Sequence, residues 1–442
     1  MSQNTQNNAP APLNPIQTTA LSLQHVVAMV VGCVTVPTIV SLAAGITGPD
    51  AVIMMQASLF VAAIAIFLQL YNLGGLVGSG LPVIVGSGFA FIATMVSIAA
   101  NPSLGISYML GAQLVGAIVA IGVGLAFKHI RFLFAPVVTS SVVITIGISL
   151  YRTALGYMAG GTGSADFGSP LNWGVAMFTL IVTLVLGNFG KGVVKTASTL
   201  FGLVAGYILA FFMGMISFDS VTSAGWFQAP QPLHFGLDFD AAAIVSLALV
   251  FVISAVQDIG QFEATSGGAF NRRATDKEIT GGIIGNSLSS LVGAFTGGAP
   301  AATAGQNVGI VVSSGVTAKP VFILAGVLVL ITSLVPKAAA VFLTIPSAVL
   351  GGATVTVFGS IAMTGITILS NAAGLSRRNL TIAGLAIAMA IGLSYFPEPF
   401  AGFPAWFQSV FGTSPVLIAA LVSIILNLVL PAEPKPAPAE QK

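Results

Sequence analysis

Charged residues are scarce in this sequence. Only 6% of its 442 residues are charged, whereas 56% are hydrophobic, and the mean hydropathy is +1.00. Soluble domains carry about 25% charged residues, so this chain has too little charge to cover a soluble surface. Most of its surface must face lipid or lie inside a helical bundle. The composition therefore excludes a soluble globular protein and predicts an all-α integral membrane protein in contact with the lipid bilayer.

Cysteine, histidine and clustered basic residues are almost absent as well. The single cysteine, Cys33, excludes an intramolecular disulfide and a thiolate metal cluster. The three histidines are far apart, and the sequence offers no paired nucleophile and base, so we expect neither a metal or cofactor site nor an enzyme. A net charge of +2 from scattered basic residues also argues against nucleic acid as a partner.

Both ends of the chain differ from the rest. Residues 1–20 are rich in Asn, Gln and Pro and lack Lys and Arg, so we interpret them as a disordered tail and not as a signal peptide. Residues 431–442 form a Pro/Ala/Glu/Lys string that cannot build a core.

Between the tails, fourteen apolar stretches are long enough to cross about 30 Å of hydrocarbon. The expected spans are 22–43, 51–70, 82–100, 107–127, 133–150, 172–188, 194–216, 241–262, 280–297, 301–314, 319–335, 340–366, 380–396 and 410–430.

The positions of the basic residues test this count, because short cytoplasmic loops hold an excess of Lys and Arg. With both termini in the cytoplasm, all basic residues except Arg152 and Lys337 fall on the cytoplasmic side. A miscount by one segment in the middle of the chain would destroy this segregation. We therefore expect a multi-pass protein of the plasma or inner membrane.

Two of the fourteen segments contain many glycines and a proline that would break a continuous helix. They are NLGGLVGSGLPVIVGSGFAF, residues 72–91, and GAFTGGAPAATAGQNVGI, residues 293–310. They lie about half the chain apart, which predicts two inverted repeats of seven segments, with short extended stretches before half-helices 3 and 10. Interrupted segments paired across two halves indicate a transporter binding site. The alternative is that these glycines only let helices pack closely.

The eighth segment carries most of the polar residues. Ser254, Gln257, Asp258 and Gln261 recur at spacings of three and four, so we expect them on one helical face. Glu263 lies roughly 140° around the helix from Asp258, so the two acids cannot face the same small ligand. An ionisable group at this depth indicates a functional site. We favour Asp258 as the proton-coupling group, with Glu263 as the alternative or as an ion-pair partner at the cytoplasmic end.

These residues resemble the nucleobase/ascorbate transporter family, the nucleobase:cation symporters of the second type, and within it the purine and xanthine permeases. GQNVGIVVSSGV, residues 305–316, is similar to the family signature, and LQHVVAMVVGCVTVP, residues 23–37, is similar to its first segment. GSGFAF, residues 86–91, and the VQDIG stretch, residues 256–260, resemble its third and eighth segments.

The resemblance implies a core domain of residues 21–130 and 240–336, a gate domain of residues 131–217 and 337–430, and a homodimer. It implies that a nucleobase lies between half-helices 3 and 10 and the eighth segment. By position, Phe89, Gln257, Gln306 and Asn307 would line or brace the pocket, with support from His25, Gln261 and Asn286.

The sequence departs from the family at three positions. Gln257 replaces the usual glutamate, Asn286 replaces an acid in the ninth segment, and Ala304 replaces an aromatic residue. Asp258 is then the remaining candidate proton carrier, with protons as the coupling ion and no cofactor. If the carboxylate has shifted by one position, coupling can persist; if Asp258 faces away from the site, the alternative is an uncoupled protein.

A glutamine presents a donor and an acceptor side by side, which matches the edge of a purine. Gln306 resembles the purine type of signature, and Ala304 enlarges the pocket, so both favour a bicyclic base. The sequence therefore predicts a secondary active transporter that imports purine nucleobases by proton symport. The alternative is an uncoupled facilitator, or a transporter of uracil or another small anion, on the same fold.

Overall fold

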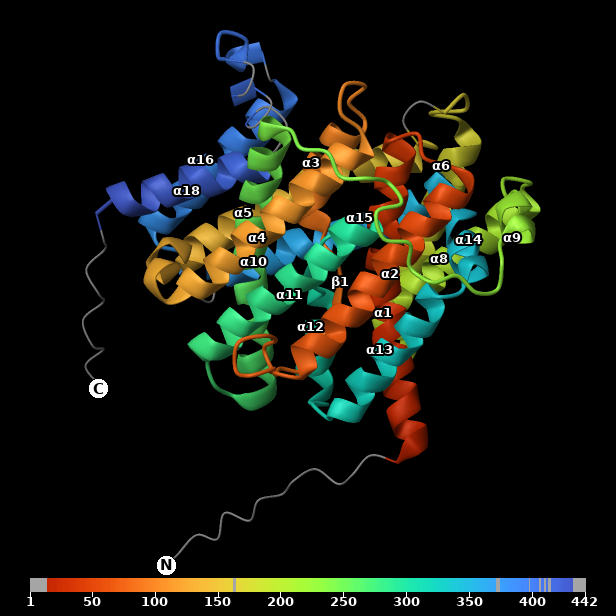
Figure 1. The fold of residues 1–442 in the computed structure, drawn as a ribbon, viewed down its shortest axis with the longest axis horizontal. Coiled ribbons are helices and arrows are strands. Elements are labelled where there is room, and N and C mark those ends of the chain that lie inside the picture. Colours follow the sequence, from red (N-terminus) through yellow and green to blue (C-terminus); the bar gives the residue numbers. More distant parts are fainter. Residues whose placement is uncertain are drawn as a thin grey trace, which may run out of the picture.

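The computed structural model describes residues 14–161, 164–370, 374–396, 398–404, 407–408, 411 and 415–431. These residues are mostly helical (Figure 1). The elements are α1 (Pro15–Ala43), α2 (Gly48–Leu70), β1 (Val85–Ser87), η1 (Phe89–Phe91), α3 (Ile92–Ala99), α4 (Ile106–Ile130), η2 (Arg131–Phe134), α5 (Pro136–Met158), α6 (Pro170–Phe189), α7 (Val193–Thr196), α8 (Ser198–Phe212), α9 (Asp219–Ser223), α10 (Ala241–Phe270), α11 (Asp276–Thr296), β2 (Ala301–Thr303), α12 (Gly305–Ser314), α13 (Lys319–Ser333), α14 (Pro336–Leu343), α15 (Ser347–Ile368), α16 (Arg377–Tyr395), η4 (Glu398–Phe400) and α18 (Pro415–Val429).

The described helices confirm a multi-span membrane protein. Eight are long and apolar enough to cross a membrane, or nine if α13 and α14, bent by 84°, count as one span. Three shorter apolar helices, Phe89–Ala99, Ser198–Phe212 and Pro415–Val429, accompany them. The count of fourteen spans and the inverted repeat stay predictions.

Two boundaries differ from the sequence-based expectation. Helix α1 begins at Pro15, inside the stretch expected to be a disordered tail, because Asn14 and Gln17 form a reciprocal capping box at its start. The span expected at 340–366 is interrupted: α14 ends at Leu343 and α15 begins at Ser347. Pro346 explains the break, since a proline disfavours helical geometry in the residue before it. Residues 1–13 and 432–442 of the expected tails lie outside the described residues.

The expected extended stretches are present as β1 and β2, which pair antiparallel at the centre of the molecule. Val85 lies opposite Thr303, and Ser87 lies opposite Ala301. Gly297 ends α11 with a φ of +85°, a left-handed conformation that glycine adopts without strain, and the chain then turns into β2. Each strand is followed by a short helical segment, η1 and α3 after β1 and α12 after β2.

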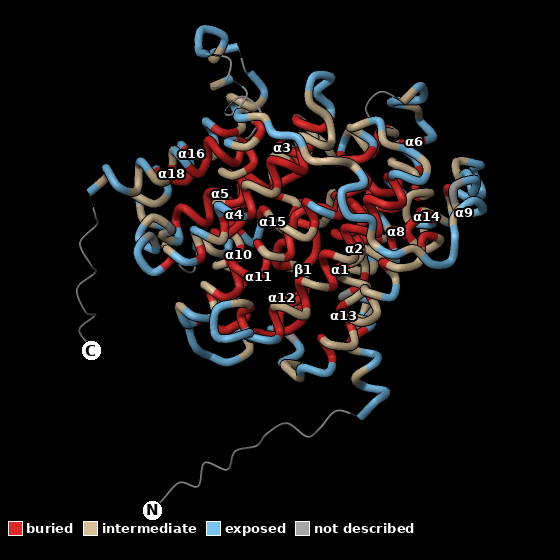
Figure 2. The backbone as a smooth tube through the Cα atoms, in the orientation of Figure 1, coloured by how far each residue is buried: buried red, intermediate tan, exposed pale blue. Residues whose placement is uncertain are grey.

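The helices pack in two groups. In one group, α4 packs on α10 and α11, while α2 packs on α1, α11 and α13; in the other, α15 packs on α5, α6 and α8, and α18 packs on α5 and α16. Buried backbone gathers around β1, α1 and α12, and the exposed segments lie mainly at the rim (Figure 2). The short strand pair therefore lies in the best protected part of the molecule.

Candidate functional site

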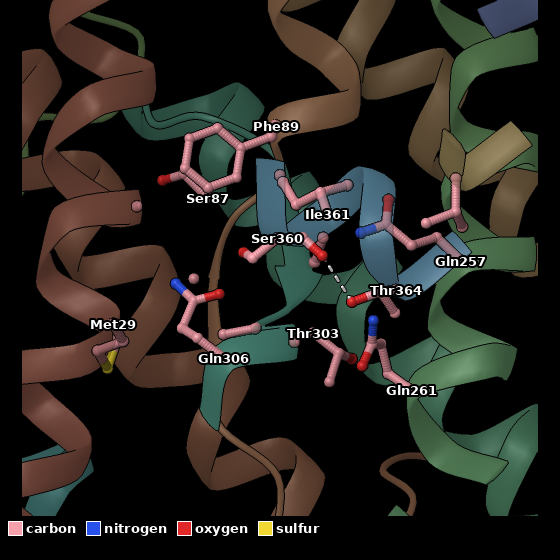
Figure 3. Close-up of a pocket in the computed structure, with 17 residues that line it drawn as sticks. Met29, Ser87, Phe89, Gln257, Gln261, Thr303, Gln306, Ser360, Ile361 and Thr364 are labelled. Carbon is pink, nitrogen blue, oxygen red and sulfur yellow. Dashed lines mark hydrogen bonds between the residues drawn. The ribbon is translucent and has the colours of Figure 1, made fainter. Parts of the chain in front are cut away.

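A cavity lies where the β1–β2 pair meets the second group of helices. One wall comes from α1, β1, η1, α10, β2 and α12, and the other comes from α5 and α15. Figure 3 labels the side chains that define it: Met29, Ser87, Phe89, Gln257, Gln261, Thr303, Gln306, Ser360, Ile361 and Thr364. Of the described residues that line it, none carries a charged side chain.

Three glutamine amides supply most of the polar character of this cavity. Gln257 and Gln261 come from α10, one helical turn apart, and Gln306 is the second residue of α12. In Figure 3, Gln306 lies on one side of the cavity, and Gln257 and Gln261 lie on the other. Each amide has a donor and an acceptor, so a flat heterocycle that lies between them can form hydrogen bonds along two of its edges.

Two polar atoms beside this cavity are buried without a hydrogen-bond partner in the described part of the chain. They are Oε1 of Gln257 and Oγ of Ser87. Buried polar atoms in folded proteins are nearly always paired, so an unpaired one requires an explanation. A bound polar ligand would satisfy both atoms.

The half-helices add backbone donors to the site. The residues before η1 and α12, Gly88 and Ala304, make no side-chain cap to these helices. The first N–H groups of a helix have no partner within it, and they favour an acceptor or a negative charge. The starts of η1 and α12 thus suit the carbonyl oxygen of an oxopurine.

Phe89 joins the two walls of the cavity. Its ring packs edge-to-face on Phe358 of α15, with ring centroids 5.4 Å apart. Gly32 of α1 lies against it, since a Cβ atom there would make an ordinary van der Waals contact with the Phe89 ring at 3.4 Å. The half-buried ring offers its remaining face to a ligand.

Asp258 does not line the cavity, although the sequence placed it on the same face as Gln257 and Gln261. Its Oδ1 accepts the backbone N–H of Thr303 in β2 at 2.8 Å, and its Oδ2 accepts Nδ2 of Asn286 at 2.8 Å. Asn286 in turn accepts Nε2 of Gln69 at 2.8 Å. Adjacent helical residues point roughly 100° apart, and this turns Asp258 toward α11 and β2. The buried acid braces the strand that leads into α12.

Asn307 and His25 also lie behind the cavity wall. Nδ2 of Asn307 donates to the backbone oxygen of His25 at 2.9 Å and lies 3.2 Å from its Nδ1. Both side chains are fully buried. They connect the start of α12 to α1, so the structure gives Asn307 a bracing position and leaves Gln306 as the signature residue that faces the cavity.

Glu263 lies at the end of α10, away from the cavity. It forms an ion pair with Arg131 at 3.5 Å and accepts the backbone N–H of Ala274 at 3.1 Å. This matches the interpretation of Glu263 as an ion-pair partner, and the partner is Arg131. Among the described residues, no group of three or more His, Cys, Asp or Glu side chains could hold a metal ion.

Sequence reasoning missed the part of the cavity that α15 contributes. Ser360 and Thr364 face the cavity one turn apart, with Ile361 between them. Thr364 Oγ1 donates to the backbone oxygen of Ser360 at 2.9 Å (Figure 3). The signal was present in the sequence, because two hydroxyl residues at a spacing of four share one face of a helix.

Comparison with known proteins places this geometry in context. Residues 16–399 match a family model described as the Permease family. The chain is 34% identical over 414 residues to the xanthine permease of Bacillus subtilis (strain 168), covering 93% of each chain. It is 36% identical over 420 residues to the uric acid permease PucK of the same organism, covering 94% of this chain and 95% of that one.

A solved structure shares the fold. The transmembrane domain of the cyanobacterial bicarbonate transporter BicA superposes with a TM-score of 0.54 at 16% identity, over 92% of this chain and 97% of that one. At this identity the likeness shows the fold alone.

Proposed function

We propose that this protein is a secondary active transporter that imports purine nucleobases. The chain belongs to the nucleobase/ascorbate permease family, so it is a permease and not an enzyme. Xanthine and uric acid permeases are among its relatives at 34% and 36% identity over most of the chain. The proposal also places it in the plasma or inner membrane with both termini in the cytoplasm, as a homodimer.

One observation carries the choice of an uncharged, hydrogen-bonding substrate. The cavity is lined by three glutamines and no charged side chain, and Oε1 of Gln257 and Oγ of Ser87 are buried there without partners. An anion without a donor group would leave Oε1 of Gln257 unpaired. A purine offers donors to these oxygens, acceptors to the amide N–H groups, and a flat face to Phe89.

Alternating access follows from the two packing groups. The α1–α4 and α10–α13 helices form the proposed core domain, and the α5–α8 and α15–α18 helices form the proposed gate domain. The substrate cavity lies between them, so movement of one group against the other exposes the site to either side of the membrane. This division is supported by which helices pack together.

Proton coupling through Asp258 is indirect in this proposal. Both of its oxygens accept hydrogen bonds, and protonation adds to one of them an O–H group that needs an acceptor of its own. We expect the hydrogen bonds to Thr303 and Asn286 to rearrange as this O–H group finds its acceptor. Because Thr303 precedes Gln306 by three residues, a shift of β2 moves the start of α12 and with it a substrate-binding amide.

Asp258→Asn tests this coupling. An amide cannot accept on both sides, and it removes the titrating group, so we expect the variant to lose accumulation driven by a pH gradient while retaining counterflow exchange of labelled purine. Glu263→Gln, an acid on the same helix outside the cavity, is the control and should keep the pH dependence. Unchanged pH-driven accumulation in Asp258→Asn would remove this residue from the coupling mechanism.

The second candidate is an uncoupled facilitator, or a transporter of uracil or another small anion, on the same fold, and the shared fold with a bicarbonate transporter favours testing it. Competition among xanthine, uric acid, hypoxanthine, guanine, adenine, uracil and bicarbonate, with and without a proton uncoupler, distinguishes these functions. We expect purines to compete and the uncoupler to abolish accumulation. Inhibition by uracil or bicarbonate alone would refute the purine assignment.

A further inference from the structure

We propose that a second cavity, adjoining the first, is a release-side binding site for the same purine. The inference rests on the proposed function and adds a place where the base is held between the transport site and the cytoplasm. The second cavity lies between α1, α6, the start of α8, α12 and α15.

The two cavities share two residues. Gln306 and Ser360 line both of them. The second cavity extends from this pair to Asn188, Ser198 and Thr199, where α6 ends and α8 begins. In the proposed orientation this is the cytoplasmic end, because the intervening loop contains Lys191 and Lys195. A base that leaves the first cavity past Gln306 therefore enters the second.

The second cavity is the larger of the two. Its volume is about 270 Å³, compared with about 50 Å³ for the first cavity. A bicyclic base therefore has more room in the second cavity than in the first.

The lining of the second cavity resembles that of the first in its chemistry. Its polar side chains are hydroxyls and amides, and none of the described lining residues is charged. The polar lining residues are Thr183, Asn188, Ser198, Thr199, Gln306, Thr356 and Ser360. Donors and acceptors of this kind suit a neutral heterocycle, whereas an ion would require compensating charge. Apolar side chains of α1 and α6, including Val31 and Leu184, provide contacts for the ring faces.

Gln306 is suited to pass the base from one cavity to the other. Its Nε2 donates to the backbone oxygen of Ala28 at 3.4 Å, which is long for such a bond. The residue is exposed to the two cavities, although it lies deep in the molecule. Rotation of a weakly held amide costs little, so the same side chain can follow the purine past Ser360.

Cysteine protection tests the second site. The chain has one cysteine, Cys33, which is buried, so Ser198→Cys introduces a thiol that lines the second cavity, and Lys191→Cys provides an exposed control on the neighbouring loop. In inside-out vesicles, we expect xanthine to slow maleimide labelling at position 198 several-fold and to leave labelling at position 191 unchanged. Thr199→Cys serves as the second reporter if Ser198→Cys transports poorly.

The Gln257→Ala background separates this inference from the proposed function. It disables the first cavity without touching the second, so protection at position 198 should persist there although uptake is lost. Two results would overturn the second site and leave the proposed function intact. One is that protection of position 198 disappears in the Gln257→Ala background. The other is that saturating xanthine gives no protection in a protein that still transports xanthine. Failure of the unmodified protein to take up any purine would overturn the proposed function itself.

Discussion

Gln257 and Asp258 are adjacent in the chain, yet they belong to different surroundings. Gln257 faces the substrate cavity with an unpaired Oε1, whereas Asp258 is buried with both oxygens hydrogen-bonded to β2 and α11. In the proposed mechanism, the residue that binds the base and the residue that carries the proton are therefore neighbours on α10. This separation lets each residue be altered without direct loss of the other function.

Gln257→Ala should weaken purine binding. The variant removes a hydrogen-bond donor and an acceptor from a site where the bound ligand has given up its hydrogen bonds to water. A buried polar group left without a partner costs about 1–3 kcal/mol. This corresponds to roughly 5- to 150-fold in affinity, measured as the inhibition constant of xanthine against labelled substrate. Gln231→Ala, on the exposed loop before α10, is the control. Equal affinity in Gln257→Ala and Gln231→Ala would refute the pocket assignment.

At the level of elements, the β1–β2 pair fixes where both half-helices begin. Three paired positions bring residues more than two hundred apart in sequence into register. The sequence predicted extended stretches from glycine and proline, but it did not reveal that they pair. Small residues allow this close approach, and Gly88 is the tightest case at the site: a Cβ there would lie 2.7 Å from the Phe91 ring and 3.1 Å from Cβ of Ala302.

Gly88→Ala should therefore destabilise the site. Phe91 is fully buried and cannot move freely, and overpacking of this kind costs about 1–3 kcal/mol. We expect a lower melting temperature in detergent together with reduced uptake. Gly309→Ala is a matched control, because it lies within α12 with no atom within 4 Å of the added Cβ, and alanine stabilises a helix interior by about 0.5–1 kcal/mol. Equal stability of the two variants would contradict the close packing at Gly88.

The N-terminus of α11 is held by a capping box that depends on pH. Glu278 accepts from Thr275 and forms a two-bond ion pair with Arg272, at 2.6 and 2.8 Å. Burial acts to raise the pKa of Glu278, but the hydrogen bonds from Arg272 and Thr275 outweigh it and hold this pKa below its usual value of 4.5. A depressed pKa means that Glu278 contributes stability above the unfolded-state pKa, and that this contribution is lost as the pH falls through the folded-state pKa.

Glu278→Gln should remove this part of the acid sensitivity. We expect the variant to be less stable than the wild type at pH 7, and we expect the difference in stability between the two proteins to narrow below about pH 4.5. Thermal unfolding in detergent, measured across the pH range, tests this. A difference that stays constant down to acidic pH would contradict a role for the ionised carboxylate.

For the whole molecule, function depends on how the two packing groups meet. Gly260 of α10 lies beside α5 and α15: its added Cβ would be 3.7 Å from Cγ2 of Thr139 and 3.7 Å from Cδ1 of Ile368. These contacts join the proposed core to the proposed gate near a cavity of about 780 Å³ that includes Arg131 and Glu263 in its lining. Relative movement of the groups must change them.

A disulfide across this contact should stop transport. In the double variant Gly260→Cys with Thr139→Cys, we expect oxidation to tie α10 to α5, because a Cβ at position 260 would lie 3.7 Å from Cγ2 of Thr139. We expect uptake to fall on oxidation and to recover with dithiothreitol, whereas each single variant is insensitive to both treatments. Full transport by the cross-linked protein would exclude movement of these helices against each other.

The sequence by itself determined the membrane class, the two interrupted segments and the amides of the site. Hydropathy and local glycine and proline chemistry act over short stretches of chain, so these features need no tertiary contact to be recognised. Gln257, Gln306 and Phe89 were likewise identified from their positions in short motifs, and the structure brings them to one cavity.

Only the tertiary structure decided which way Asp258 points, that β1 pairs with β2, that Asn307 braces His25, and that Ser360 and Thr364 complete the wall. Each of these depends on contacts between segments far apart in sequence, and a helical face in the sequence does not reveal its neighbour. The second cavity is of the same kind, since it exists only where five helices meet around Gln306.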